Sequence, residues 1–185
     1  GTGINTVKDE NRIRRAVGLL VLTTMVRSKN GVRHVQMGPR PLSQKEFVNL
    51  DRDEKEFVLQ TDSGSLYMWQ GLPSGTCFLI DSDGKGLTNK HVVEDYVRAK
   101  EEVRLYADIS KMYSDELTGP LEFSPAILVY FGDKEPFLVS DVKISDTYDL
   151  AGISIKNCTD RPFFTPANIE DAKRTEKVWA IGFPG

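Results

Sequence analysis

One stretch of the chain, residues 73–95, places a histidine in a sequence pattern that suits acid–base chemistry. An apolar run is followed by a polar turn, a second short apolar run and then His91, and the residues after His91 have the pattern of a first helical turn. This succession predicts a strand, a turn, a second strand and a histidine held at a strand-to-helix corner. An imidazole titrates near neutral pH and suits general acid–base chemistry. A lone histidine is more often structural, so His91 by itself assigns no function.

The same stretch does not fit a calcium or a phosphate site. Asp81, Asp83 and Gly86 match the start of a calcium loop, in which glycine takes the sixth position. However, Lys85 occupies the fifth position and Val92 the twelfth, so two oxygen ligands are missing, including the bidentate carboxylate. The run GKGLTNK also lacks the four-residue spacer of a phosphate loop. We therefore expect no metal and no cofactor.

A second segment, residues 141–157, carries a carboxylate, Asp149. Apolar residues recur with a period of about two on both sides of a break, at Val142 and Ile144 before it and at Leu150, Ile153 and Ile155 after it. This period predicts two adjacent strands with Asp149 between them. Because 58 residues separate Asp149 from His91, the two can meet only in a folded domain.

Both segments resemble those of trypsin-like serine proteases, most closely the HtrA-style branch. In that branch a succession G-S/T-G-F-I-I-D, D-G and L-T-N-x-H-V-V carries the histidine, and residues 75–93 follow it. Cys77 departs from the pattern, which usually has glycine there. The acid of the family stands in a D-x-A-x-[LIV]-x-[LIV] setting, which residues 149–155 match. The resemblance covers residues 72–185, the N-terminal part of a protease domain.

This resemblance implies a role for each residue. His91 corresponds to the general base that later protonates the leaving amine, and Asp149 corresponds to the acid that holds the imidazole in one tautomer and stabilises the imidazolium. Asp146 is the nearest competitor of Asp149, but Leu-Ala does not follow it.

The nucleophilic serine is expected outside this sequence. Residues 176–185 resemble, more weakly, the strand and G-x-P turn that open the second barrel of these proteases. In the family the serine, in a G-x-S-G-G motif, follows in that barrel, together with the oxyanion-hole amides and the specificity pocket. Within this chain, Ser63 in the run TDSGS is the nearest candidate. It would need serine before histidine in the chain, and a turn between two strands is the commoner role of such a run.

The composition favours a soluble globular protein. The chain has 185 residues, 39% hydrophobic and 28% charged, enough for one domain with a sizeable core or one domain with an extension. A net charge of −3 gives no electrostatic reason to expect nucleic acid or an anionic membrane as a partner. The basic and apolar residues 12–22 are too few to span a bilayer. Two cysteines, Cys77 and Cys158, make no disulfide framework, and whether they pair stays open.

Residues 1–60 are expected to be an N-terminal extension. A β-hairpin is predicted over residues 19–37, because Asn30-Gly31 is a strong turn signal. A capping-box pattern at Ser43 predicts a helix to about Lys55, followed by a strand over residues 56–60. The possible core positions of this helical region are Phe47, Val48, Leu50 and Phe57.

Residues 61–185 are expected to form the first lobe of the protease domain and to reach the start of the second. The patterns predict six short strands, over residues 66–70, 76–80, 86–89, 126–131, 137–144 and 150–156. They also predict a helix over residues 94–102, a strand over residues 103–107 and a surface insertion over residues 108–125. The fold class expected is mainly β: the first β-barrel lobe of a chymotrypsin-like double barrel.

We therefore expect the His/Asp-bearing half of a serine endopeptidase that acts on polypeptides. Its expected partner is a C-terminal protease lobe carrying the serine, and no membrane span is expected. A catalytically inactive, protease-like binding or scaffold domain is the alternative, which the absence of a downstream G-x-S-G-G motif would favour. The family resemblance favours a cell-envelope or secreted location.

Overall fold

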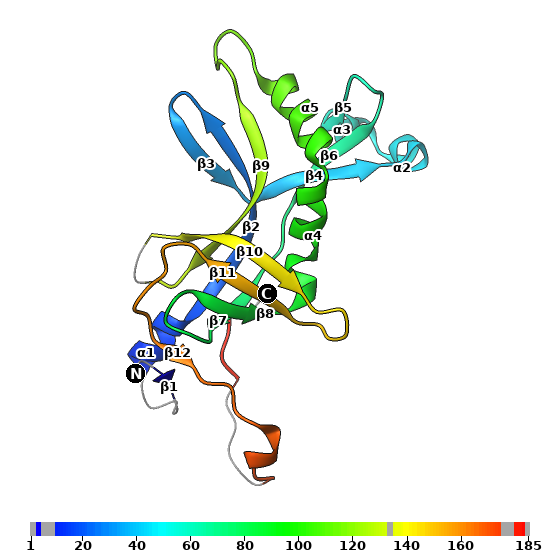
Figure 1. Cartoon of the computed structure of the whole chain (residues 1–185). Helices are drawn as coiled ribbons and strands as arrows, with labels where there is room; N and C mark the ends of the chain where they lie inside the picture. Colours follow the sequence, from blue (N-terminus) through cyan, green and yellow to red (C-terminus); the bar gives the residue numbers. More distant parts are fainter. Residues whose placement is uncertain (1–2, 5–9, 133–134, 175–179, 184–185) are drawn as a thin grey trace. The chain divides into compact units, whose positions relative to one another are not determined.

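A computed structural model describes residues 3–4, 10–132, 135–174 and 180–183 (Figure 1). The chain divides into two compact units. Unit 1 comprises residues 1–21, 74–97 and 127–185, and unit 2 comprises residues 22–73 and 98–126.

The secondary structure of the described residues is mainly β. The strands are β1 (Gly3–Ile4), β2 (Val17–Ser28), β3 (Gly31–Val35), β4 (Met37–Leu42), β5 (Val58–Gln60), β6 (Leu66–Gly71), β7 (Ser74–Leu79), β8 (Lys85–Thr88), β9 (Glu122–Tyr130), β10 (Phe137–Ile144), β11 (Ala151–Ile155) and β12 (Phe163–Phe164). The helices are α1 (Glu10–Ala16), α2 (Gln44–Asn49), α3 (Arg52–Lys55), α4 (Lys90–Glu101), α5 (Val103–Tyr113) and the short 3-10 helix η1 (Ile169–Asp171).

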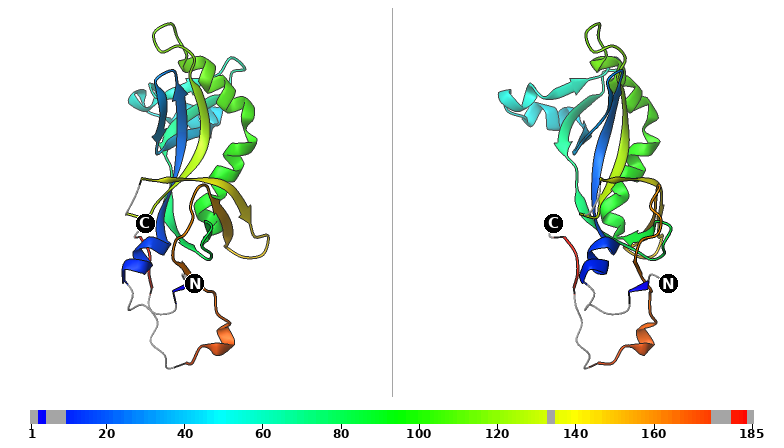
Figure 2. Two further views of the ribbon diagram at one scale, coloured as in Figure 1. Left: turned by 60° about the vertical axis from the view of Figure 1, so that its left-hand side comes forward. Right: turned by 90° about the vertical axis from the view of Figure 1, so that its left-hand side faces the viewer.

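Six strands close into an antiparallel β-barrel. The main sheet has the order β3-β2-β7-β8-β11-β10-β9, and β2 also pairs with β9, so the sheet returns to β2. Figures 1 and 2 show β8, β11 and β10 curving side by side in all three views. Closure leaves these six strands without a free edge along the barrel. The expectation of a mainly β chain with a barrel is thereby confirmed.

The barrel does not use the set of strands that we predicted. Its first strand is β2, whose residues Val17–Val21 pair with Ser74–Phe78 of β7, so part of the barrel lies inside the expected extension 1–60. The predicted strand 66–70 is β6, which pairs with β4 and β5 in a separate three-stranded sheet. Local alternation shows that a segment is a strand but does not identify its partner, which explains the error.

The turn between β7 and β8 explains why the sequence has aspartate and glycine there. One carboxylate oxygen of Asp81 accepts hydrogen bonds from the backbone N–H of Asp83 at 2.8 Å and of Lys85 at 3.0 Å. Gly84 has φ +89°, and a Cβ there would lie 2.5 Å from the carbonyl oxygen of Ile155. Only glycine fits such a position without strain. The run that imitates a calcium loop is therefore a turn that fixes β8.

The start of α4 is held by two buried valines. Val92 is 7% exposed and Val93 is fully buried. A Cβ at Gly75 of β7 would lie 2.7 Å from both methyl groups of Val92, so the helix approaches the strand as closely as it does because residue 75 is glycine. His91 lies immediately before these anchors, and its position on the barrel is therefore set by packing.

The segment after α4 is a helix, which contradicts the predicted strand 103–107 and shortens the predicted insertion 108–125. Helix α5 buries Leu105, Tyr106 and Ile109. Their spacing is that of one helical face. The prediction relied on a run of residues too short to distinguish the helical period of about 3.6 residues from the strand period of about 2. Val103, at the start of the helix, is 71% exposed.

The predicted helix 43–55 is two short helices. Ser43 begins α2 and Asp51 begins α3, each with a complete capping box, and the extended backbone of Asp51 separates them. Neither helix buries a residue, and Val48 and Phe57 are 68% and 67% exposed, so placing them in the core was wrong. The hairpin of β2 and β3 is confirmed, with Ser28 paired to Gly31.

Cys77 and Cys158 are both buried and form no disulfide bond, and burial raises the pKa of Cys77 to about 12. Most of the predicted strand within residues 176–185 lies outside the described residues. Residues 180–183 are described and form no strand, but the N–H of Phe183 donates to the hydroxyl of Thr76 at 2.7 Å. Within the described ranges, no helix combines the length and the apolar character that a membrane crossing requires.

Candidate active site

The pairing of β8 with β11 brings His91 and Asp149 together. Thr88, the last residue of β8, pairs with Ala151, the first residue of β11, in antiparallel register. The chain leaving β8 and the chain entering β11 therefore run side by side beyond this pair. His91 is the second residue of α4, and Asp149 is the last but one residue of the loop between β10 and β11. Two residues far apart in sequence thus meet at one corner of unit 1.

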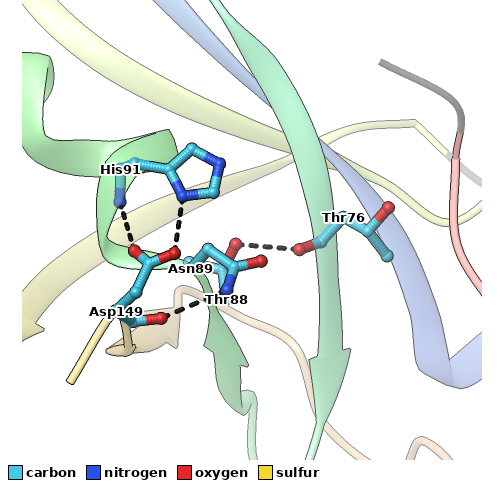
Figure 3. A network of polar contacts seen from close by, with 5 residues as sticks. All are labelled: Thr76, Thr88, Asn89, His91 and Asp149. Atoms are coloured by element: carbon cyan, nitrogen blue, oxygen red, sulfur yellow. Dashed lines mark hydrogen bonds and ion pairs between the residues drawn. The ribbon is translucent and has the colours of Figure 1, made fainter.

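Asp149 binds His91 through both carboxylate oxygens (Figure 3). One oxygen accepts a hydrogen bond from the backbone N–H of His91 at 2.9 Å. The other lies 2.7 Å from Nδ1 of the imidazole ring. Because an ionised carboxylate can only accept, we assign the hydrogen of this second bond to Nδ1. In the neutral ring, Nε2 then carries the lone pair.

These contacts keep Asp149 ionised. The hydrogen bond from the His91 backbone N–H, followed by that from its ring, holds the pKa of Asp149 below its usual value. A carboxylate that accepts such bonds is stabilised in its charged form. At neutral pH the imidazole therefore faces a negative charge on its Nδ1 side.

The outer side of the ring is open. The side chains of His91 and Asp149 are 67% and 53% exposed. Figure 3 shows Nε2 directed away from Asp149, and among the described residues no hydrogen bond to Nε2 is found. A basic nitrogen with a fixed direction and access to solvent can take a proton from a group that approaches it.

Two polar residues just before His91 complete the local network. The buried Thr88 donates its hydroxyl to the carbonyl oxygen of Thr76 at 2.8 Å. The side-chain amide of Asn89 donates to the backbone carbonyl of Asp149 at 3.1 Å. Both residues belong to the L-T-N-x-H-V-V pattern, but neither contact was predicted from it. The sequence feature that could have indicated these contacts is the pair of polar residues between an apolar strand and the histidine.

The other candidates lie elsewhere. Ser63 belongs to unit 2, where its hydroxyl lies 2.9 Å from that of Thr61 and 3.4 Å from that of Ser65. These contacts suit the structural role of a turn serine. Asp146 is exposed in the loop that carries Asp149, and it is Asp149 that contacts His91.

No protein-family model, no curated protein and no solved structure matches this chain.

Proposed function

We propose that this chain is the His/Asp-bearing part of a trypsin-like serine endopeptidase, with its barrel as the first lobe of a chymotrypsin-like double barrel of the HtrA style. The observation that carries the proposal is the twofold contact of Asp149 with His91, which leaves Nε2 of the imidazole open. Supporting it, the two residues come from segments that resemble the protease family in sequence.

In the proposed mechanism, His91 moves one proton in two steps. As a serine oxygen attacks the carbonyl carbon of a peptide bond, its proton passes to Nε2 of His91, and Asp149 stabilises the imidazolium that forms. When the C–N bond breaks, the same proton passes from Nε2 to the leaving amine. Water then hydrolyses the acyl-enzyme with His91 again as the base. The serine and the oxyanion-hole donors come from polypeptide beyond this sequence.

A protease-like binding or scaffold domain without catalysis is the second candidate. The observation in its favour is that no hydroxyl group contacts Nε2 within the described residues. In such a domain the contact between His91 and Asp149 would only hold two segments of the barrel together.

Hydrolysis of polypeptides by the full-length gene product tests the proposal. We expect the wild-type protein to cleave an unfolded polypeptide and His91→Ala to be inactive. Thr147→Ala provides a matched control, because Thr147 is exposed on the loop of Asp149 and contacts Ser145 through its backbone N–H, which the substitution keeps. Equal cleavage by wild type and His91→Ala would refute the proposed role, and absence of cleavage by all three would favour the scaffold.

A further inference from the structure

One hydrogen bond, to its carbonyl oxygen, holds the backbone of Asp149. Strand β11 begins two residues later, at Ala151, so Asp149 lies outside the regular ladder. The start of its loop is closed by Ser145, whose N–H donates to the carbonyl of Leu150 at 2.9 Å and whose hydroxyl accepts from the N–H of Tyr148 at 3.0 Å. At Asp149 itself, the carbonyl oxygen accepts the 3.1 Å hydrogen bond from the side chain of Asn89.

Asn89 is well placed to hold this carbonyl because its own backbone is fixed on both sides. The preceding residue, Thr88, is 4% exposed, pairs with Ala151 and bonds through its hydroxyl to Thr76. On the other side, the carbonyl of Asn89 accepts the N–H of Val92 at 3.1 Å, which joins it to the first turn of α4. The amide of Asn89 therefore extends from a rigid corner.

The residue type also fits this role. A backbone carbonyl only accepts, so its partner must donate. A neutral amide two bonds from the main chain supplies a donor without adding a charge beside the Asp149 carboxylate. Aspartate would have the same shape but, when ionised, no hydrogen to donate and a second negative charge.

We propose that Asn89 is a positioning residue, which fixes the backbone of Asp149 so that its carboxylate reaches both the N–H and the Nδ1 of His91. Asn89 and His91 together hold one residue of the opposite loop by three hydrogen bonds, two to its side chain and one to its main chain. Without the Asn89 amide, the peptide after Asp149 loses this hydrogen bond, and the direction of the carboxylate is less well fixed. The effect of Asn89 on catalysis rests on the proposed function, whereas its effect on the position of the Asp149 carboxylate does not.

Two variants of the full-length product test the inference. Asn89→Ala removes the donor, and Asn89→Leu keeps the approximate size without adding a charge and guards against a folding defect of the first variant. Thr147→Ala is again the control. The readouts are the pKa of Asp149, from the pH titration of its labelled carboxyl carbon, and the hydrogen exchange of the His91 Nδ1–H, both measured by NMR, together with kcat and KM.

We expect both Asn89 variants to raise the pKa of Asp149 toward its usual value, to speed exchange of the Nδ1–H, and to lower kcat about 10- to 100-fold with KM nearly unchanged, as misplacement of a catalytic group does. Thr147→Ala should match the wild type in every readout. An unchanged pKa and an unchanged exchange rate in both folded Asn89 variants would overturn the inference. If these two quantities respond as expected in a protein that cleaves no polypeptide, the positioning role stands and the proposed function falls.

Discussion

The carboxylate of Asp149 bonds to the main chain of His91 as well as to its ring, at 2.9 Å and 2.7 Å. The main-chain bond fixes the carboxylate relative to the start of α4, and the ring bond fixes the imidazole relative to the carboxylate. Rotation of the ring about its own side-chain bonds is thereby restricted. The arrangement gives an exposed histidine the fixed orientation that a general base needs.

Under the proposed function, removing the charge of Asp149 should abolish most of the peptidase activity of the full-length product while preserving its fold. The variant Asp149→Asn replaces the carboxylate by an amide, which stabilises the imidazolium poorly and favours the wrong ring tautomer. We therefore expect kcat to fall roughly 10⁴-fold, the size of effect known for this change in trypsin-like triads. The measurement is peptide hydrolysis at neutral pH. Asp146→Asn, on the same loop, is the control and should retain activity; equal losses in both variants would contradict the assignment.

Stability at low pH should report the ionisation of Asp149. Its pKa is lowered in the folded protein by the hydrogen bonds from His91, so its contribution to stability is present above the unfolded-state pKa and is lost as pH falls through the folded-state pKa. Below about pH 4, the free energy of unfolding should therefore decrease more steeply with falling pH in the wild type than in Asp149→Asn. Urea unfolding at a series of pH values measures this difference. Parallel curves below about pH 4 would show that the pKa of Asp149 is the same in the folded and unfolded states.

The close approach of β7 and α4 should make residue 75 sensitive to any side chain. A methyl group at Gly75 would lie 2.7 Å from both methyl groups of Val92, a β-branched residue with little rotamer freedom. We expect Gly75→Ala to lower the free energy of unfolding by about 1–3 kcal/mol. Gly152→Ala is the matched control in β11, since a Cβ there meets no atom within 4 Å. Chemical denaturation of both variants decides the point, and equal stabilities would contradict the packing described for the start of α4.

Two substitutions in residues 103–109 distinguish a helix from a strand. In helix α5, Ile109 is fully buried while Val103 is 71% exposed. We expect Ile109→Ala to cost about 2–5 kcal/mol of stability. Val103→Ala should change stability by less than about 0.5 kcal/mol. A strand would place both residues on the same face, so comparable losses in thermal or chemical denaturation would contradict the helix.

The contact between His91 and Asp149 was more predictable from sequence than the fold around it. His91 and Asp149 lie in motifs whose local order of strand, turn and corner is encoded within a few residues, and the structure brings the two side chains into contact. The sequence predicted β2 as a strand of a hairpin but not as a strand of the barrel, because its pairing with β7 joins two segments that are far apart in the sequence. The helix predicted after Ser43 is divided in two because a second capping box, at Asp51, begins a new helix. The prediction considered only the first capping box.

Some features leave no local signal at all. Arg161 is 2% exposed, donates from Nε to the carbonyl of Arg15 at 3.0 Å, and lies 4.1 Å from the ring centre of Phe131. A buried arginine is rare and requires partners that tertiary structure supplies, so no sequence pattern predicts it. The bond from Asn89 to the carbonyl of Asp149 is of the same kind, because it depends on the register between β8 and β11.

The central claim, that His91 and Asp149 serve a serine nucleophile, is tested most directly by labelling with a fluorophosphonate. The protein is purified from its natural source, labelled, and read by intact-mass spectrometry and peptide mapping. We predict one label, on a serine outside these 185 residues, in the same or a companion polypeptide, and its loss in a His91→Ala variant. A label on Ser63 would contradict the assignment of the nucleophile, and no label on the intact full-length product would contradict the claim that this is a serine protease.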